Sequence, residues 1–122
     1  MRHTGPMLAL LVVVADIVGV WRGDSVCTQR PSSCTDEHVV YHIAKGDGAD
    51  AVTIQASKVV DGKELDMGTL ACTLEPEKGD LRCPIPKGVF ELHVAGAEIT
   101  GTLRLTDGTL YRRIAVKRVP HG

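Results

Sequence analysis

The sequence contains no asparagine and only four aromatic residues. The first absence bears on glycosylation, and the second bears on nucleic-acid binding. Without asparagine there is no N-glycosylation sequon. Basic and acidic residues are interspersed, the formal net charge is −1, and no basic block occurs. Because nucleic-acid surfaces usually combine a basic patch with stacking aromatic side chains, we expect no nucleic-acid partner.

The motifs of common enzyme classes are also missing. There is no G-x-S-x-G turn, no H-E-x-x-H sequence and no phosphate-binding glycine loop. The acidic residues are scattered and mostly adjoin predicted turns, so they form no evident general acid–base pair. We therefore expect a protein that is not an enzyme and that has no cofactor and no metal site.

The longest hydrophobic run, residues 7–14, is too short to span a membrane. It has eight residues (MLALLVVV), whereas a membrane-spanning helix needs about 20. A short basic start precedes the run, and small or β-branched residues lead from it to Ala15. This layout predicts a signal peptide over residues 1–15 and a secreted or periplasmic single domain over residues 16–122, with no membrane span. The alternative is that the run forms a buried first strand or helix of the domain.

The four cysteines are Cys27, Cys34, Cys72 and Cys83. An even number in a small exported chain predicts disulfides. Of the three possible connectivities, we favour Cys27–Cys34 and Cys72–Cys83, because the first encloses a turn with Pro31 and the second joins two strands of a predicted hairpin. A zinc site is the competing interpretation, but gaps of six and ten residues differ from the usual C-x2-C spacing.

Alternating apolar and polar residues, interrupted by turn residues, predict eight strands after the signal. Asp107-Gly108 is the strongest hairpin signal. The short connections favour an all-β, antiparallel up-and-down meander that closes into a barrel, with a two-sheet β-sandwich as the alternative. The predicted strands cover residues 18–27, 37–44, 51–60, 65–74, 81–85, 89–95, 99–106 and 109–119.

Gly19 and Trp21 form a Gly-x-Trp motif at the start of the first predicted strand. A Gly-x-Trp motif at the start of an eight-stranded meander resembles the calycin superfamily, which includes lipocalins, fatty-acid-binding proteins and avidins. The resemblance implies that Trp21 closes one end of the barrel and that an arginine from late in the chain packs across it, with cation–π attraction. The candidates for that arginine are Arg112, Arg113 and Arg118.

The size and layout of the chain are also similar to those of periplasmic metalloprotease inhibitors of bacteria, which are small eight-stranded barrels with the same motif. In those inhibitors an N-terminal arm of several residues is inhibitory, whereas here only residues 16–18 lie between the predicted cleavage site and Gly19. Residues 34–41 (CTDEHVVY) and 107–112 (DGTLYR) resemble segments of uncharacterised exported bacterial proteins.

Basic residues interrupt the apolar faces of two predicted strands. Lys58 continues the apolar face of residues 52–56, and Arg112 and Arg118 lie on the apolar face of the last strand. A charge inside a barrel is costly unless it is paired. We therefore expect Lys58, Arg112 and Arg118 to bind a small apolar or carboxylated molecule. The alternative places them at the barrel rims, or stacks Arg112 on Trp21.

Two short patterns have simpler explanations than the functions they suggest. His38 and His42 lie in a predicted strand, where four residues span about 13 Å, so one metal ion could not bind both. We expect them to be solvated or paired across strands. Arg22-Gly23-Asp24 spells a cell-attachment triplet, but it lies inside a predicted strand and not in a bulging loop, so we expect a coincidence.

Three classes of function remain open. A carrier of a small molecule predicts a cavity near Lys58 and Arg112. An interaction or protease-inhibitor module predicts a solid barrel that acts through the disulfide-closed 28–33 loop, which contains Gln29, Arg30 and Pro31. The third class is a structural envelope protein with no discrete site.

Overall fold

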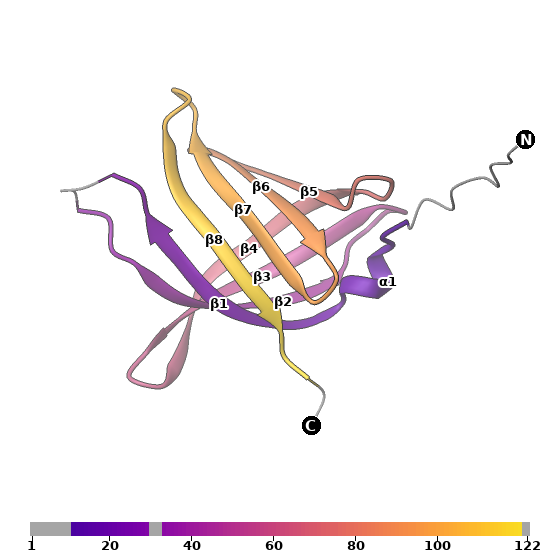
Figure 1. The fold of residues 1–122 in the computed structure, drawn as a ribbon, viewed down its shortest axis with the longest axis horizontal. Helices are drawn as coiled ribbons and strands as arrows, with labels where there is room; N and C mark the ends of the chain where they lie inside the picture. Colours follow the sequence, from indigo (N-terminus) through magenta and orange to yellow (C-terminus); the bar gives the residue numbers. More distant parts are fainter. Residues whose placement is uncertain (1–10, 30–32, 121–122) are drawn as a thin grey trace, which may run out of the picture.

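In the computed structural model, which describes residues 11–29 and 33–120, antiparallel strands close into a barrel (Figure 1). Each strand pairs with the next one in the sequence, and β1 pairs with β8 to close the barrel. A one-turn helix, α1 (Val14–Ile17), precedes the strands. The predicted all-β up-and-down barrel is therefore confirmed, and the two-sheet sandwich is wrong. The strands are β1 (Gly19–Cys27), β2 (Glu37–Lys45), β3 (Ala51–Val60), β4 (Lys63–Glu75), β5 (Asp80–Ile85), β6 (Gly88–Ala95), β7 (Glu98–Leu105) and β8 (Leu110–Arg118).

The core lies inside the barrel and takes side chains from every strand. Burial alternates along most strands, as expected when one face of a sheet is apolar and the other is wet. The side chains of Trp21, Ile54 and Ile99 are fully buried. Glycines let the strands approach closely, since a Cβ at Gly23 would lie 1.9 Å from the Ala115 carbonyl oxygen.

Both predicted disulfides, Cys27–Cys34 and Cys72–Cys83, are present. The second one joins β4 to β5 from inside the barrel, where both of its cysteines are buried. Its Cα atoms are 4.2 Å apart, close to the roughly 4.5 Å of directly opposed residues in a non-hydrogen-bonded antiparallel pair.

The ladder between β4 and β5 is short. It contains only the pairs Thr73–Arg82, Leu74–Leu81 and Glu75–Asp80. Extending the same register places Pro84 of β5 opposite Ala71 of β4, at the next position where the two strands would exchange hydrogen bonds. Proline has no N–H to donate, so the ladder stops there. Among the described residues, 63–72 of β4 consequently form no ladder pair with β5, although the disulfide joins Cys72 to it.

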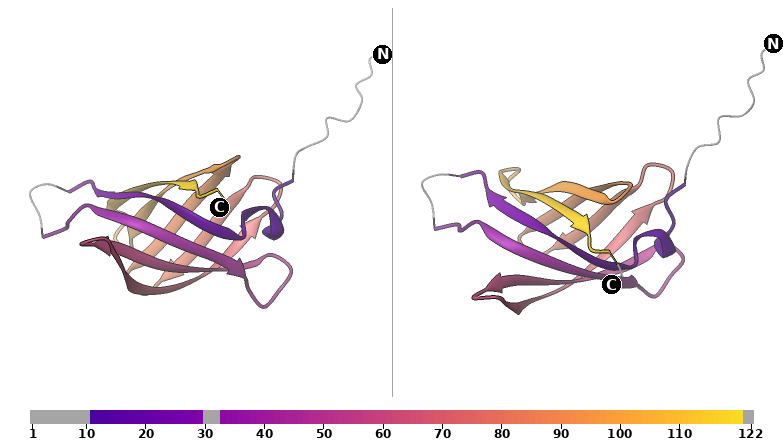
Figure 2. Two further views of the ribbon diagram at one scale, coloured as in Figure 1. Left: turned by 90° about the horizontal axis from the view of Figure 1, so that it is seen from below. Right: turned by 60° about the horizontal axis from the view of Figure 1, so that its bottom comes forward.

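The hairpin of β3 and β4 projects beyond the rim of the barrel (Figures 1 and 2). Its turn, Asp61-Gly62, has positive φ at both residues, as a two-residue hairpin turn requires. The hairpin carries three exposed apolar side chains, Val60, Leu65 and Met67.

Helix α1 packs against the opposite end of the barrel. Its side chains Val14 and Ile17 are buried, and Val12 donates a backbone hydrogen bond to the Pro76 carbonyl at 3.0 Å. Cleavage after Ala15 stays a prediction, and it would remove Val14 from the core. Residues 1–10 of the predicted signal lie outside the described residues. Among the described residues, no helix has the length and apolar character needed to cross a membrane.

Candidate functional site

One end of the barrel is closed by Trp21, the first long side chain of β1. The indole is fully buried, and its Nε1 donates a hydrogen bond to the Ile17 carbonyl at 2.9 Å. The Arg118 guanidinium lies 4.6 Å from the ring centroid and donates hydrogen bonds to the Val18 and Asp16 carbonyl oxygens. Of the three candidate arginines, the structure thus assigns the cation–π contact to Arg118, which does not line the cavity described next.

The other half of the barrel contains a partly open cavity of about 440 Å³. Its wall is mainly apolar, and Ser25, Glu37 and Arg112 form a polar corner where β1, β2 and β8 meet. The apolar lining comes from Val39, Tyr41, Ala56, Met67, Leu70, Ile85, Phe90 and Leu103, and the other lining residues are Ser25, Glu37, Gly68, Thr69 and Arg112. The cavity is therefore a pocket for a largely apolar group with a polar corner.

Arg112 occupies this polar corner, and its positive charge is compensated within the protein. Its Nη1 lies 3.7 Å from the Glu37 carboxylate and donates to the Ser25 hydroxyl at 3.1 Å, while Nη2 donates to the Thr35 carbonyl at 3.1 Å. The side chains of Arg112 and Glu37 are 13% and 20% exposed. A partly buried ion pair with further hydrogen bonds satisfies both charges, so the corner offers a ligand little net charge.

Tyr41 places a buried phenol in the wall of the cavity. The residue is 4% exposed, and burial raises the pKa of its hydroxyl, with the Glu37 carboxylate adding to the rise and Arg112 opposing it. The hydroxyl is therefore neutral at physiological pH and remains a hydrogen-bond donor. It has no hydrogen-bond partner within the described chain. Buried polar groups are usually paired, so an unpaired one at a cavity wall indicates a ligand or water partner.

Lys58, the third predicted ligand residue, does not line the cavity. It pairs with Val39 of β2 and Leu65 of β4, where the β3–β4 hairpin leaves the barrel. Its ammonium group has no ion pair among the described residues, and neither has that of Lys63, nearer the turn. Of the three predicted residues, only Arg112 contributes to the cavity.

Two residues of the site, Glu37 and Tyr41, were not among the residues predicted to bind a ligand. The alternation Glu37-Val39-Tyr41-Ile43 puts all four side chains on one face, which was a detectable signal. What the pattern does not reveal is that Arg112, far along the chain, pairs with Glu37 across β1.

The histidines of β2 are paired, as predicted. His38 bonds to Asp24 at 2.6 Å and His42 to Glu64 at 2.8 Å, both on the outer surface. Asp24 is the third residue of the Arg22-Gly23-Asp24 triplet, which lies within β1. The 28–33 loop is described only in part, since Arg30 and Pro31 lie outside the described residues. Its role as an interaction loop stays a prediction.

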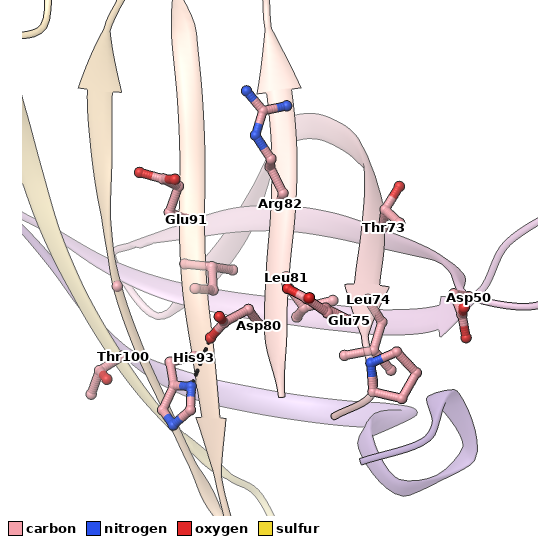
Figure 3. Close-up of a pocket in the computed structure, with 13 residues that line it drawn as sticks. Asp50, Thr73, Leu74, Glu75, Asp80, Leu81, Arg82, Glu91, His93 and Thr100 are labelled. Carbon is pink, nitrogen blue, oxygen red and sulfur yellow. Dashed lines mark hydrogen bonds and ion pairs between the residues drawn. The ribbon is translucent and has the colours of Figure 1, made fainter. Parts of the chain in front are cut away.

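A larger depression, of about 680 Å³, lies over the outer wall of β4 to β7. Figure 3 shows its Asp80–His93 pair, 2.8 Å apart on adjacent strands, with Arg82 and Glu91 farther along the same strands. The charged side chains that line it are largely exposed, and solvent screens them. It offers no buried, unpaired polar group, so we regard the interior cavity as the better candidate site.

The geometry defines a class of protein: a disulfide-bonded, closed eight-stranded β-barrel with a partly open cavity at one end. No protein-family model matches the chain, and no curated protein matches its sequence. Among the described residues, no group of three or more His, Cys, Asp or Glu side chains is arranged to hold a metal ion.

Proposed function

We propose that the protein is an exported, calycin-like carrier that holds a small, mostly apolar molecule inside its barrel. The observation that carries the proposal is the unpaired, buried hydroxyl of Tyr41 in the wall of an apolar cavity. The cavity volume, about 440 Å³, falls in the range of pockets that bind small molecules, roughly 300–1,000 Å³. Disulfides support export, since they persist in oxidising compartments.

The polar corner favours an uncharged ligand. Glu37 already compensates the charge of Arg112, so a carboxylate entering the cavity would meet a carboxylate as well as a guanidinium. The neutral phenol of Tyr41 suits a carbonyl or ether oxygen. A carboxylated ligand would instead rely on Lys58 at the rim. We therefore favour an apolar molecule with one uncharged hydrogen-bond acceptor.

Filling the cavity tests whether it is the binding site. The probe is N-phenylnaphthylamine, a neutral dye that fluoresces in apolar surroundings. Ala56→Phe places a ring in the cavity, and we expect it to abolish dye binding. Ala44→Phe, the same change at an exposed position of β2, is the control and should bind dye normally. Equal binding by both variants would refute the proposal.

Tyr41→Phe tests the chemistry of the ligand. Dibutyl ketone and nonane have the same number of carbon atoms, and only the ketone accepts a hydrogen bond. The wild-type protein should prefer dibutyl ketone in competition with the dye, and Tyr41→Phe should lose this preference by about fivefold, the value of one hydrogen bond. An unchanged preference would show that Tyr41 does not contact the ligand.

A further inference from the structure

The hairpin of β3 and β4 extends past the rim of the barrel and has two chemically different faces (Figures 1 and 2). Its strands pair Lys58 with Leu65 and Val60 with Lys63. Directly opposed residues in a sheet face the same way, and so do residues two apart along one strand. Ala56, which lines the cavity, lies two residues before Lys58. All four side chains therefore lie on the side that continues the inner wall of the barrel, which we call the inner face of the hairpin.

The inner face is apolar and basic. Val60 and Leu65 are 42% and 45% exposed, and Met67, which also lines the cavity, is 43% exposed. Neither Lys58 nor Lys63 has an ion pair among the described residues. Exposed apolar side chains that lie together, rimmed by polar residues, mark a surface that contacts a partner or a membrane.

The acidic residues of the hairpin lie on its other face or in its turn. Glu64 bonds to His42 at 2.8 Å on the outer surface of the barrel, and Asp66 accepts a hydrogen bond from the Gln55 amide at 2.7 Å. Asp61 lies in the turn. The hairpin is thus not basic as a whole, but its charges are segregated, and the lysines lie beside the exposed apolar side chains.

This segregation makes the inner face complementary to an anionic lipid surface. Each lysine near such a surface is attracted to it, and its long apolar stem lets the ammonium group reach the lipid phosphates while neighbouring apolar side chains enter the interface. Glu37, the acid in the adjoining cavity wall, is paired with Arg112 and adds no uncompensated negative charge. Met67 connects the inner face to the cavity, so a hairpin that lies on a membrane sets the partly open cavity beside the lipid.

We propose that the β3–β4 hairpin docks on an anionic lipid surface through its inner face, with Lys58 and Lys63 at the phosphates and Val60 and Leu65 in the interface. The inference goes beyond the proposed function, because it assigns a second surface and its partner, whereas the cavity holds the cargo. Together the two describe a carrier that loads or unloads against a membrane, where an apolar molecule need not cross water.

Vesicle sedimentation with the disulfide-bonded protein tests the docking surface. We expect binding to vesicles of phosphatidylcholine and phosphatidylglycerol in equal parts, and binding at least tenfold weaker to phosphatidylcholine alone. Lys63→Gln should weaken binding to the anionic vesicles about fivefold, the value of one lysine near a charged surface. Lys45→Gln, the same change at the far end of β2, is the matched control and should bind normally.

Two further changes separate docking from a structural role. Val60→Ser removes apolar contact from the inner face and should weaken vesicle binding about threefold, while Val26→Ser, on the outer face of β1, should not change it. Asp61→Asn removes the acid of the turn, and asparagine also tolerates the positive φ there. This variant should bind anionic vesicles about fivefold more tightly, a gain that a purely structural residue would not give.

Several results would overturn the inference. Equal binding to neutral and anionic vesicles would remove the role of the lysines, and equal effects of Lys63→Gln and Lys45→Gln would place the contact elsewhere. A dimer in sedimentation that Val60→Ser dissociates would show that a second copy of the chain covers the face. Neither Lys63 nor Val60 lines the cavity, so both variants should still bind N-phenylnaphthylamine. A wild-type protein that binds the dye but no vesicle refutes docking and leaves the carrier, and one that binds anionic vesicles but no dye does the reverse.

Discussion

Arg112 and Arg118 share one face of β8 but contact different partners. Arg118 stacks on Trp21 and donates to two carbonyl oxygens at the closed end, whereas Arg112 pairs with Glu37 beside the cavity. Six residues of strand separate them by about 20 Å. The two guanidinium groups therefore belong to opposite halves of the barrel, one stabilising its closure and the other satisfying a polar corner.

Removing the Arg118 guanidinium should weaken the closed end. Arg118→Ala loses the cation–π contact and two hydrogen bonds, and we expect it to lower the free energy of unfolding by about 2 kcal/mol. Arg113→Ala, at an exposed neighbouring position, should have little effect. Urea unfolding followed by the fluorescence of Trp21, the only tryptophan, measures both. Equal losses in the two variants would contradict the assigned contact.

Glu64 should titrate below its ordinary carboxyl pKa of 4.5, chiefly because it accepts a hydrogen bond from His42. Its stabilising effect is then present above pH 4.5 and lost as the pH falls through the lowered pKa. NMR titration of the carboxyl group measures this, and His42→Val should raise the pKa of Glu64. The pKa of Asp66, lowered by bonds from Gly68 and Gln55, should stay unchanged. A Glu64 pKa that His42→Val leaves unaltered would rule out the pair.

For single residues, the sequence predicts which side chains face the interior but not which side chains they contact there. Strand alternation placed both Arg112 and Arg118 on the inner face of β8. Choosing the residue that reaches Trp21 requires the stagger between β1 and β8, where Trp21 pairs directly with Arg118. Stagger is a property of barrel closure and leaves no mark on the periodicity of either strand.

At the scale of elements, the Cys72–Cys83 disulfide holds β4 and β5 together where hydrogen bonds do not. Replacing both cysteines with alanine should lower the free energy of unfolding by about 3 kcal/mol. It should also increase the hydrogen exchange of Thr73 and Arg82, the last pair of the short ladder. Replacing Cys27 and Cys34, which lie outside that ladder, should leave the exchange unchanged. Unaltered exchange in the first variant would contradict this role of the disulfide.

The eight strands were predictable because their alternation and turn residues are local signals. The short ladder between β4 and β5 was not predicted, although Pro84 lies just beyond its end. The predicted strand over residues 81–85 includes this proline, and the sequence interpretation gave it no role in pairing. Its effect depends on the register set by the turn between Glu75 and Asp80, which brings Pro84 opposite Ala71.

At the scale of the whole molecule, the two ends of the barrel differ. Trp21, Arg118 and helix α1 fill one end, and a cavity occupies the other, with a buried Tyr41 hydroxyl that no other described residue bonds. A structural envelope domain with no discrete site would have no need to keep such a hydroxyl beside an apolar cavity. This asymmetry supports a carrier, with its cargo held in one half of the barrel.

Native mass spectrometry of the protein purified from its own export route tests the central claim most directly. We predict a bound mass, retained in the folded barrel and released by mild denaturation, that belongs to a small, mostly apolar molecule. The dissociated chain should be lighter by four hydrogens, as two disulfides require. A folded protein that carries no additional mass, and that also fails to take up N-phenylnaphthylamine, would contradict the account.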